Sequence, residues 1–307
     1  MKTYDPTALI FDPVLARKLK FDIIGEILKA IKWPDTKVLR FLISSIVGLP
    51  TRRFAEIMAD FDRVIGEKGL RFASDHLLEK LINIVTEIGV EMIPSEGPTI
   101  IASNHPGTYD ALAILSQLPR EDVKIIVGSN PFFCDMPNGR KFLIFATRKQ
   151  NERFEVIRQA IHHLQKGGLL LIFPAGHIDP DPAILEVAEE RFQNWSRSLT
   201  VFLRKVPQTK LILAVTSGVI TKEYINHPLP NLFKGHERRR IIEFMQVIKQ
   251  MIFLQTKDLN PKICFKEESR YNPHEGLDHS KRMDSICSQE FDLFQAHLKE
   301  FYTHTKE

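Results

Sequence analysis

Apolar side chains recur at steps of three and four residues along the first part of the chain, and this spacing is typical of an α-helix. The spacing runs through residues 13–85 and is clearest over residues 54–65. Gly and Pro interrupt it at Trp33-Pro34, at Gly48-Leu49-Pro50 and between Gly66 and Gly69. We therefore expect several short helices that pack together into an N-terminal helical region.

Beyond residue 85 the apolar residues gather in short runs that are typical of strands. The runs at 90–93 and 99–102 flank the turn-rich segment 94–98, which predicts a hairpin. Further strands are expected at 123–127, 142–146, 169–173 and 210–217, and helices at 110–118, 152–165, 192–204, 237–256 and 283–301. This alternation predicts an α/β fold in which a mixed sheet is covered by helices.

The same pattern divides the chain into three parts. Residues 1–87 form the N-terminal helical region, residues 88–260 an α/β domain, and residues 261–307 a polar linker followed by a C-terminal helix. The apolar run at 41–50 is about half as long as the ~20 residues that a membrane-spanning helix needs, and arginines flank it. No spanning segment is predicted.

The composition is that of a globular protein, because 43% of the 307 residues are hydrophobic and 26% are charged. The three cysteines are an odd number without metal-type spacing, which argues for a reducing compartment and against a disulfide framework. The first residues lack the features of a secretory signal. We therefore expect a cytoplasmic protein.

The net charge is only +4, but basic residues cluster at 17–20, 52–53 and 238–240. Such clusters can hold a protein to anionic lipid, and they can equally be a solvated surface. A nucleic-acid partner is not expected, because the clusters come without an aromatic or helix-turn-helix framework.

The candidate chemistry lies where His105 precedes Asp110 by five positions. The spacing alone is weak evidence, since His279 and Asp284 repeat it in a polar segment near the C-terminus. The first pair differs in context, because a predicted strand leads into His105, Pro106-Gly107 turns the chain, and Asp110 opens a helix. On one continuous helix the two side chains would face apart, so the histidine must precede the helix for the pair to meet.

A paired aspartate fixes the tautomer of an imidazole and raises its basicity, so that the other ring nitrogen can remove a proton from a hydroxyl group. This chemistry needs no serine or cysteine nucleophile. The alternative is that Asp110 only caps the helix and that His105 is an ordinary loop residue. The residues by themselves leave both interpretations open.

Three segments resemble, in order, signature blocks of the glycerol-phosphate and lysophosphatidate acyltransferase family. Residues 104–110 (NHPGTYD) resemble the first block, Asn-His-x-x-x-x-Asp after a strand. Residues 142–148 (FLIFATR) resemble the second block, which ends in arginine, and residues 173–177 (FPAGH) resemble the third, Phe-Pro-Glu-Gly-Thr-Arg. The resemblance covers roughly residues 88–225, and the strand at 211–217 is a weaker match to the fourth block.

The resemblance implies a glycerol-3-phosphate acyltransferase-like fold and an acyl transfer in which His105 acts as general base on a lipid hydroxyl group while Asp110 orients it. The donor substrate is then acyl-CoA or acyl carrier protein, and no metal or other cofactor is implied. Arg148 matches the arginine that binds acceptor phosphate, with Lys149 beside it. The other candidate substrate-binding residues are Asn104, Pro174, Gly176 and His177.

The third block departs from the family pattern, because Ala175 stands in place of glutamate and Ile178 in place of the second arginine. Phosphate binding therefore loses a charged contact. His177 could replace that contact, but a histidine at this position is as often structural. Alanine at this position resembles the branch of the family that includes haemolysin-like and ornithine-lipid acyltransferases. The identity of the acceptor stays open.

The leading hypothesis is a peripheral membrane enzyme that moves a fatty acyl group from the thioester to a lysolipid or glycerol-phosphate-type acceptor. The altered third block motivates an alternative, a lipid-binding pseudoenzyme of the same fold, and a thioesterase-like hydrolase is a third hypothesis. The partners are then the acyl thioester, the lipid acceptor and a membrane surface. Candidate membrane contacts are Phe41, Leu42 and Ile43 beside Arg40, and the helix at 238–253, although such stripes also occur in helices packed in a core.

Overall fold

The computed structural model of the chain describes residues 9–146, 150–185, 192, 195–253, 257–268 and 279–302. Its first part is the expected helical region, made of α1 (Pro13–Ala30), α2 (Lys37–Lys68) and α3 (Leu70–Leu81). Pro50 lies inside α2, which continues through a kink at Val47 instead of ending. A proline inside a helix removes one hydrogen bond and bends the axis, and here the bend replaces the predicted break.

Seven strands form one mixed sheet in the order β1-β7-β6-β2-β5-β3-β4. Every neighbouring pair is parallel except β6 and β7, which are antiparallel, so β1 and β7 run against the other five strands. The bounds are β1 (Thr86–Ile88), β2 (Thr99–Ser103), β3 (Val123–Gly128), β4 (Leu143–Ala146), β5 (Leu169–Ile172), β6 (Lys210–Ser217) and β7 (Lys262–Glu267). The predicted mixed α/β sheet is confirmed.

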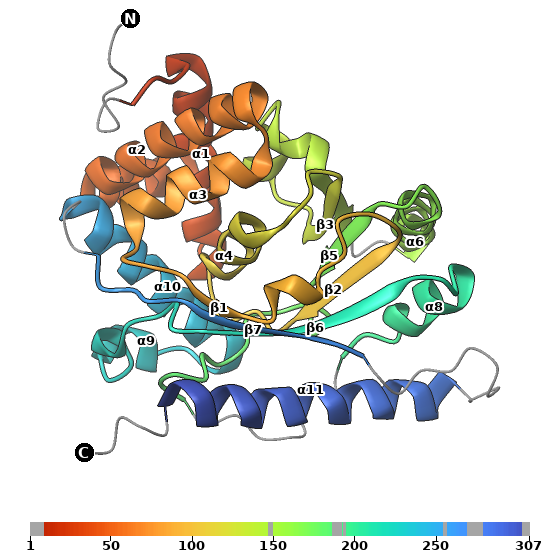
Figure 1. Cartoon of the computed structure of the whole chain (residues 1–307). Coiled ribbons are helices and arrows are strands. Elements are labelled where there is room, and N and C mark those ends of the chain that lie inside the picture. The colour runs from red at the N-terminus through yellow and green to blue at the C-terminus, as the bar shows by residue number, and fades with distance from the viewer. Residues whose placement is uncertain are drawn as a thin grey trace, which may run out of the picture.

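Helices cover both faces of the sheet, as Figure 1 shows. The first face packs against α1 to α4 and α10, and the second against α6, α8 and α11. Ile101 and Leu171 face the first layer, while their neighbours Ile100 and Leu170 face the second, because successive strand side chains point to opposite sides. The helices beyond the N-terminal region are α4 (Asp110–Gln117), α5 (Pro131–Cys134), α6 (Gln150–Gln165), α8 (Ser198–Lys205), α9 (Pro228–Asn231), α10 (Gly235–Ile252) and α11 (His279–Tyr302), with 3-10 turns at Val90–Met92, Gly139–Phe142 and Lys222–Tyr224.

The predicted hairpin over residues 90–102 is wrong. Residues 90–92 form a 3-10 turn after Gly89, and β2 lies between β5 and β6, parallel to both. All five residues of β2 are buried, as expected of a central strand in a parallel region. A strand with both edges already paired has no place for a preceding partner.

The other predicted elements agree with the structure within a few residues, apart from two differences. The helix expected at 192–204 is seen as α8 from Ser198, and part of residues 186–194 lies outside the described residues. The sequence pattern does not predict β7, which lies in the segment expected to be a polar linker. The three-part division of the chain stays a prediction.

Within the described ranges, no helix combines the length and the apolar character that crossing a bilayer requires.

The turn at Gly89, which directly follows β1, gives a test of how closely the chain packs against β7. Gly89 and Gly97 both have positive φ, at 82° and 85°. A Cβ on Gly89 would lie 2.3 Å from the carbonyl oxygen of Phe265 in β7, whereas a Cβ on Gly97 would meet nothing within 4 Å. Gly97→Ala should therefore lose about 1–2 kcal/mol of unfolding free energy from backbone strain alone, and Gly89→Ala about 2 kcal/mol more. Urea denaturation of both variants measures the difference, and equal losses would contradict this packing.

Candidate active site

The predicted catalytic segment lies at the carboxyl edge of the parallel strands. β2 ends at Ser103 and is followed by His105, and its neighbour β5 ends at Ile172 and is followed by Phe173. The ring centroids of His105 and Phe173 are 4.7 Å apart. Because parallel strands end at one edge of a sheet, segments far apart in the sequence meet there, and in open α/β sheets ligands bind at that edge.

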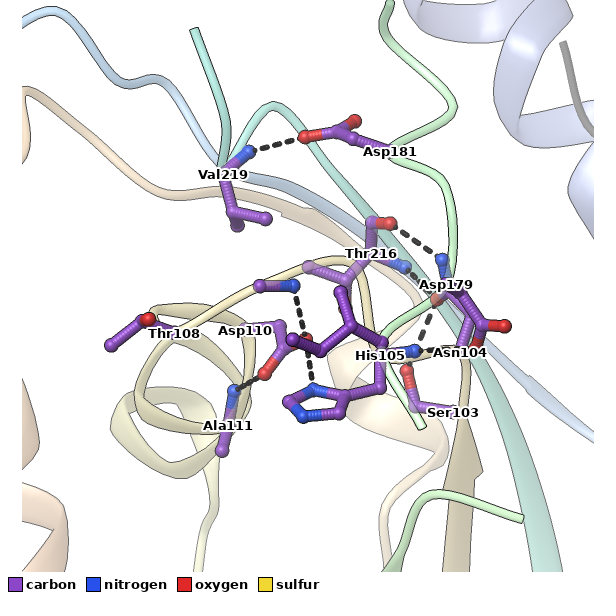
Figure 2. Close-up of polar contacts among 12 residues, drawn as sticks. Ser103, Asn104, His105, Thr108, Asp110, Ala111, Asp179, Asp181, Thr216 and Val219 are labelled. Carbon is purple, nitrogen blue, oxygen red and sulfur yellow. Dashed lines mark hydrogen bonds and ion pairs between the residues drawn. The ribbon is translucent and has the colours of Figure 1, made fainter. Parts of the chain in front are cut away.

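His105 and Asp110 meet as predicted. The distance from His105 Nδ1 to Asp110 Oδ2 is 2.7 Å, and the backbone N–H groups of Gly107 and Ala111 donate to the same carboxylate at 3.1 and 2.5 Å. The Asp110 side chain is fully buried, while 31% of the His105 side chain is exposed. Figure 2 shows the imidazole beside the carboxylate, at the start of α4. Pairing supports the catalytic interpretation, and the catalytic roles themselves stay predictions.

The electrostatics of the pair favour a protonated imidazole. Burial opposes the charge on His105, but the carboxylate of Asp110 outweighs it, with smaller help from Glu243 and Asp179, and the pKa of His105 rises to about 9. Burial also raises the pKa of Glu243 to about 7, against the pull of the nearby His105 charge. His105 is therefore a strong base that must lose its proton before it can act as one, and its neutral form increases as the pH rises toward 9.

Two aspartates that follow β5 hold the loops of the site together. His105 N–H donates to Asp179 Oδ2 at 3.0 Å, and Asp179 N–H donates to the carbonyl of His105 at 2.7 Å. The buried carboxylate of Asp181 accepts from the backbone N–H groups of Gly218, Val219 and Ile220, at 2.8–3.0 Å, and from that of Ala183. The loops after β2, β5 and β6 are therefore joined through backbone groups, as Figure 2 shows for part of this network.

Helix α10 also holds the loop that joins β2 to α4, through Thr108 and Tyr109. Thr108 Oγ1 donates to Glu243 Oε1 at 2.9 Å, and Tyr109 Oη donates to Gln250 Oε1 at 2.5 Å. A Cβ on Gly107 would lie 3.3 Å from Glu243 Oε1, so the glycine lets the helix approach closely. Glu243 and Gln250 lie two turns apart on one buried side of α10, where their polar groups are paired.

A cavity of about 970 Å³ opens beside the pair. Its volume is at the upper end of the range for ligand pockets, about 300–1,000 Å³. Apolar side chains from α2, α3, α4 and β3 line the cavity, together with His105, Asp110, Glu243 and residues from the start of α10. A second, smaller apolar cavity of about 170 Å³ lies between α1, α2 and α10, and five residues line both cavities: Phe54, Thr108, Phe132, Phe133 and Arg240. The site therefore combines a base with an apolar chamber.

The other predicted substrate-binding residues have different surroundings. Both ends of the Asn104 amide are bonded to the backbone of Thr216, at 2.9 and 2.8 Å, and this buried side chain holds β2 to β6. Gly176 and His177 line the cavity, whereas Pro174 is buried and its carbonyl accepts from Ser196 N–H at 2.9 Å. Their roles in substrate binding stay predictions.

Arg148 and Lys149 lie outside the described residues. The second spacing match, His279 and Asp284, lies within the single helix α11 rather than across a turn.

Sequence reasoning missed four residues that shape the site. Asp179 and Asp181 directly follow the third block, and acidic residues just past a buried strand are a signal that could have found them. Arg239 and Glu243 also line the cavity, but they come from a helix far along the chain. Arg239 belongs to the basic cluster at 238–240, which suggested only a lipid contact or a solvated surface, and Glu243 carries no local signal because its spacing is that of any amphipathic helix.

Comparisons with known proteins agree with this geometry. The family model described as "Acyltransferase" matches residues 84–202, which include β1 to β5 and the His105–Asp110 pair. A solved structure of the 1-acyl-sn-glycerophosphate (LPA) acyltransferase PlsC from Thermotoga maritima shares 14% sequence identity over 92% of this chain and 95% of that one, with a TM-score of 0.42. No match was found among curated proteins. Residues 84–202, which include the His105–Asp110 pair, therefore match the acyltransferase family.

Proposed function

We propose that the protein transfers a fatty acyl group from a thioester of coenzyme A or acyl carrier protein to the hydroxyl group of a lysolipid, in phospholipid synthesis. The observation that carries the proposal is the His105–Asp110 pair on the wall of a large cavity that many apolar side chains line.

The proposed reaction needs one base and no covalent acyl-enzyme. Nδ1–H of His105 donates to Asp110, which leaves Nε2 to take the proton of the acceptor hydroxyl group. The hydroxyl oxygen attacks the thioester carbonyl carbon, the carbon–sulfur bond then breaks, and the imidazolium returns the proton to the departing thiolate. Because the carboxylate of Asp110 stabilises the imidazolium formed in the first step, it lowers the barrier to proton removal.

The apolar side chains of the cavity are the proposed binding site of the acyl chain. Phe61 and Ile65 of α2, Leu70 and Leu77 of α3 and Leu115 of α4 line the cavity. Burying a methylene group contributes about 0.8 kcal/mol, so a long chain gains enough free energy to hold the thioester carbon at the base. The N-terminal helical region would thus build the acyl site.

The paired histidine also favours this proposal over one of its two alternatives. A lipid-binding pseudoenzyme has no need of a base held by a buried carboxylate. A hydrolase would use the same base on water, and the two enzymes differ in their product.

His105→Ala should lower acyl transfer by roughly 10²- to 10⁴-fold, the usual contribution of a general base. Mass spectrometry of lipids, after incubation with acyl-CoA or acyl carrier protein thioester and mixed lysolipids, measures it. His162→Ala, an exposed histidine on α6, is the matched control and should keep full activity. Full activity in the His105 variant, free fatty acid as the main product, or no acylated lipid from either donor would each contradict the proposal.

We further propose that the enzyme works at a membrane surface through α2. Val38, Phe41, Leu42, Ile46 and Leu49 follow one another at helical steps and are 47–77% exposed. Scattered exposed apolar residues are ordinary, but a contiguous stripe of them is typical of a binding surface.

One of the membrane contacts expected from the sequence is corrected by burial, because Ile43 is 8% exposed and packs against Ile24 and Leu28 of α1. In α10, six of the 18 residues are buried while Ile252 and Phe253 at its end are exposed, so a membrane contact of this helix stays a prediction. Arg40 is paired with Asp35 at 2.5 Å, so its charge is largely neutralised. The exposed stripe, with Lys37 before it and Arg52 after it, remains as the candidate surface. The cytoplasmic location stays a prediction.

The double variant Phe41→Ser/Ile46→Ser should weaken binding to anionic vesicles by about tenfold or more, because each buried side chain contributes about 1.5–3 kcal/mol. Phe154→Ser is the matched control, since Phe154 on α6 is 75% exposed and lies outside the stripe. Co-sedimentation with liposomes measures both variants. Equal binding by the double variant and the wild type, or no binding by the wild type, would refute attachment through α2.

A further inference from the structure

Three buried polar side chains follow one another along one side of α10, and two of them are neutral amides. Glu243, Gln246 and Gln250 recur at steps of three and four residues and are 7%, 3% and 6% exposed. Gln246 bonds the backbone that follows β6, at 2.8 and 2.9 Å, and Gln250 bonds Tyr109 and the backbone at the end of α3. At these two positions a neutral amide is enough to hold a loop against the helix.

Glu243 makes a contact of the same kind with an acid. Its Oε1 accepts a hydrogen bond from Thr108 Oγ1 at 2.9 Å, in the loop that joins β2 to α4. A glutamine oxygen would accept this hydrogen bond as well, without the cost of removing a charge from water. The hydrogen bond by itself therefore does not explain why a carboxylate lies at this position.

The charge of Glu243 lies close to the proposed base. Gly107 touches both carboxylates of this region, because its N–H donates to Asp110 Oδ2 at 3.1 Å and a Cβ on it would lie 3.3 Å from Glu243 Oε1. The same Asp110 oxygen lies 2.7 Å from His105 Nδ1. All three titratable groups line one cavity. The imidazole is therefore bonded to one buried carboxylate and has a second one nearby.

The groups that act on Glu243 come from several elements. Burial raises the pKa of Glu243 to about 7, and Asp110 adds to this rise, while His105, Arg240 and the hydrogen bond from the loop oppose it. Arg240 is itself paired with Glu26 of α1 at 2.5 Å. Glu243 is thus increasingly ionised as the pH rises through 7.

Glu243 acts in turn on His105. Burial lowers the pKa of His105, but Asp110, Glu243 and Asp179 raise it, and the net result is a pKa of about 9. A nearby negative charge favours the protonated ring, so the contribution of Glu243 is present above pH 7 and is lost as Glu243 takes up its proton. His105 and Glu243 therefore titrate as a coupled pair.

We propose that the charge of Glu243 sets the strength of His105 as a base, so that Glu243 is a positioning residue of acyl transfer. The hydrogen bond from Thr108 holds the carboxylate against the loop, and the charge stabilises the imidazolium that forms when His105 takes the proton of the acceptor. The inference rests on the proposed function, because the strength of the base matters to the reaction only if His105 removes a proton.

The pH dependence of kcat tests the proposal in the full chain, with the thioester and the lysolipid that the wild type uses best. Wild-type kcat should rise with pH toward 9, as His105 becomes neutral. In Glu243→Gln the midpoint should fall by about one pH unit, the lower end of the effect of a nearby charge. Above pH 9 the weaker base should lower kcat by up to about tenfold, whereas near pH 7 a larger neutral fraction offsets this loss. The ratio of variant to wild-type kcat should therefore fall as the pH rises.

Two further variants separate the charge from the hydrogen bond. Thr108→Val removes the hydroxyl group but keeps the carboxylate, so it should lower kcat by a similar factor at every pH and leave the midpoint in place. Glu237→Gln makes the matched change on α10 at a glutamate that pairs with Lys32 outside the cavity, and it should behave as the wild type. A Glu243→Gln profile with the wild-type midpoint, or with the same loss at every pH, would overturn the proposal.

An NMR titration of the His105 ring, with ¹⁵N-labelled histidine, distinguishes this inference from the proposed function because it needs no turnover. In the wild type, the protonated ring should show a small step near pH 7, where Glu243 ionises, before the main step near 9. In Glu243→Gln the first step should be absent, and the main step should fall by about one unit. A wild type without the step near pH 7 would contradict the inference even if the variant did not fold.

The two measurements together assign each failure. Both NMR changes without acyl transfer by the wild type would uphold the effect of Glu243 on His105 and refute the transferase proposal. A His105 titration that is indifferent to Glu243, with His105-dependent transfer intact, would refute the role of Glu243 and leave the proposed function standing.

Discussion

The carboxylate of Asp110 is buried completely, and this constraint determines much of the site around it. Removing an ion from water costs several kcal/mol unless its oxygens are bonded. Three donors meet this need here, the imidazole of His105 and the backbone N–H groups of Gly107 and Ala111. The turn before α4 brings the histidine back over the helix start, where its imidazole bonds the buried carboxylate.

The pair is useful because its surroundings are rigid. Asp179 holds the backbone of His105 from the loop after β5, and Asp181 bonds the same loop to the backbone after β6. Glu243 and Gln250 of α10 hold the next two residues of the catalytic loop, Thr108 and Tyr109. Two of these four hydrogen bonds are buried and the other two are partly buried, so they lose little to solvent and hold the imidazole of His105 in place.

The cavity combines polar groups with a largely apolar lining. Apolar side chains of α2, α3 and α4, residues at the start of α10 and His105 all line it. Beside the base, the carboxylates of Asp110 and Glu243 raise the pKa of His105, and this strengthens it as a proton acceptor at the cost of a smaller neutral fraction near pH 7. The site favours base strength over the abundance of the free base.

Local patterns predicted what depends on local interactions. The continuous apolar runs predicted β3, β5 and β6, and the Pro106-Gly107 turn before Asp110 predicted that His105 and Asp110 meet. Both predictions were possible because a strand, a turn and a helix start all have signals within a few residues. The hairpin failed because pairing of β2 with β5 and β6 is non-local, and β7 was missed because charged residues break its short apolar run. Ile178 illustrates the limit most clearly: the sequence shows the loss of an arginine there, whereas the fold brings the guanidinium of Arg239 to the carbonyl of that residue.

The most direct measurement of the central claim is an NMR titration of the His105 imidazole, with ¹⁵N-labelled histidine, in the wild type and in Asp110→Asn. If the buried carboxylate makes His105 the base, the neutral ring of the wild type carries its proton on Nδ1 and titrates with a pKa near 9, and both features are lost when Asn replaces Asp110. A His105 that titrates near 6.5, the ordinary value, in both proteins would contradict the account.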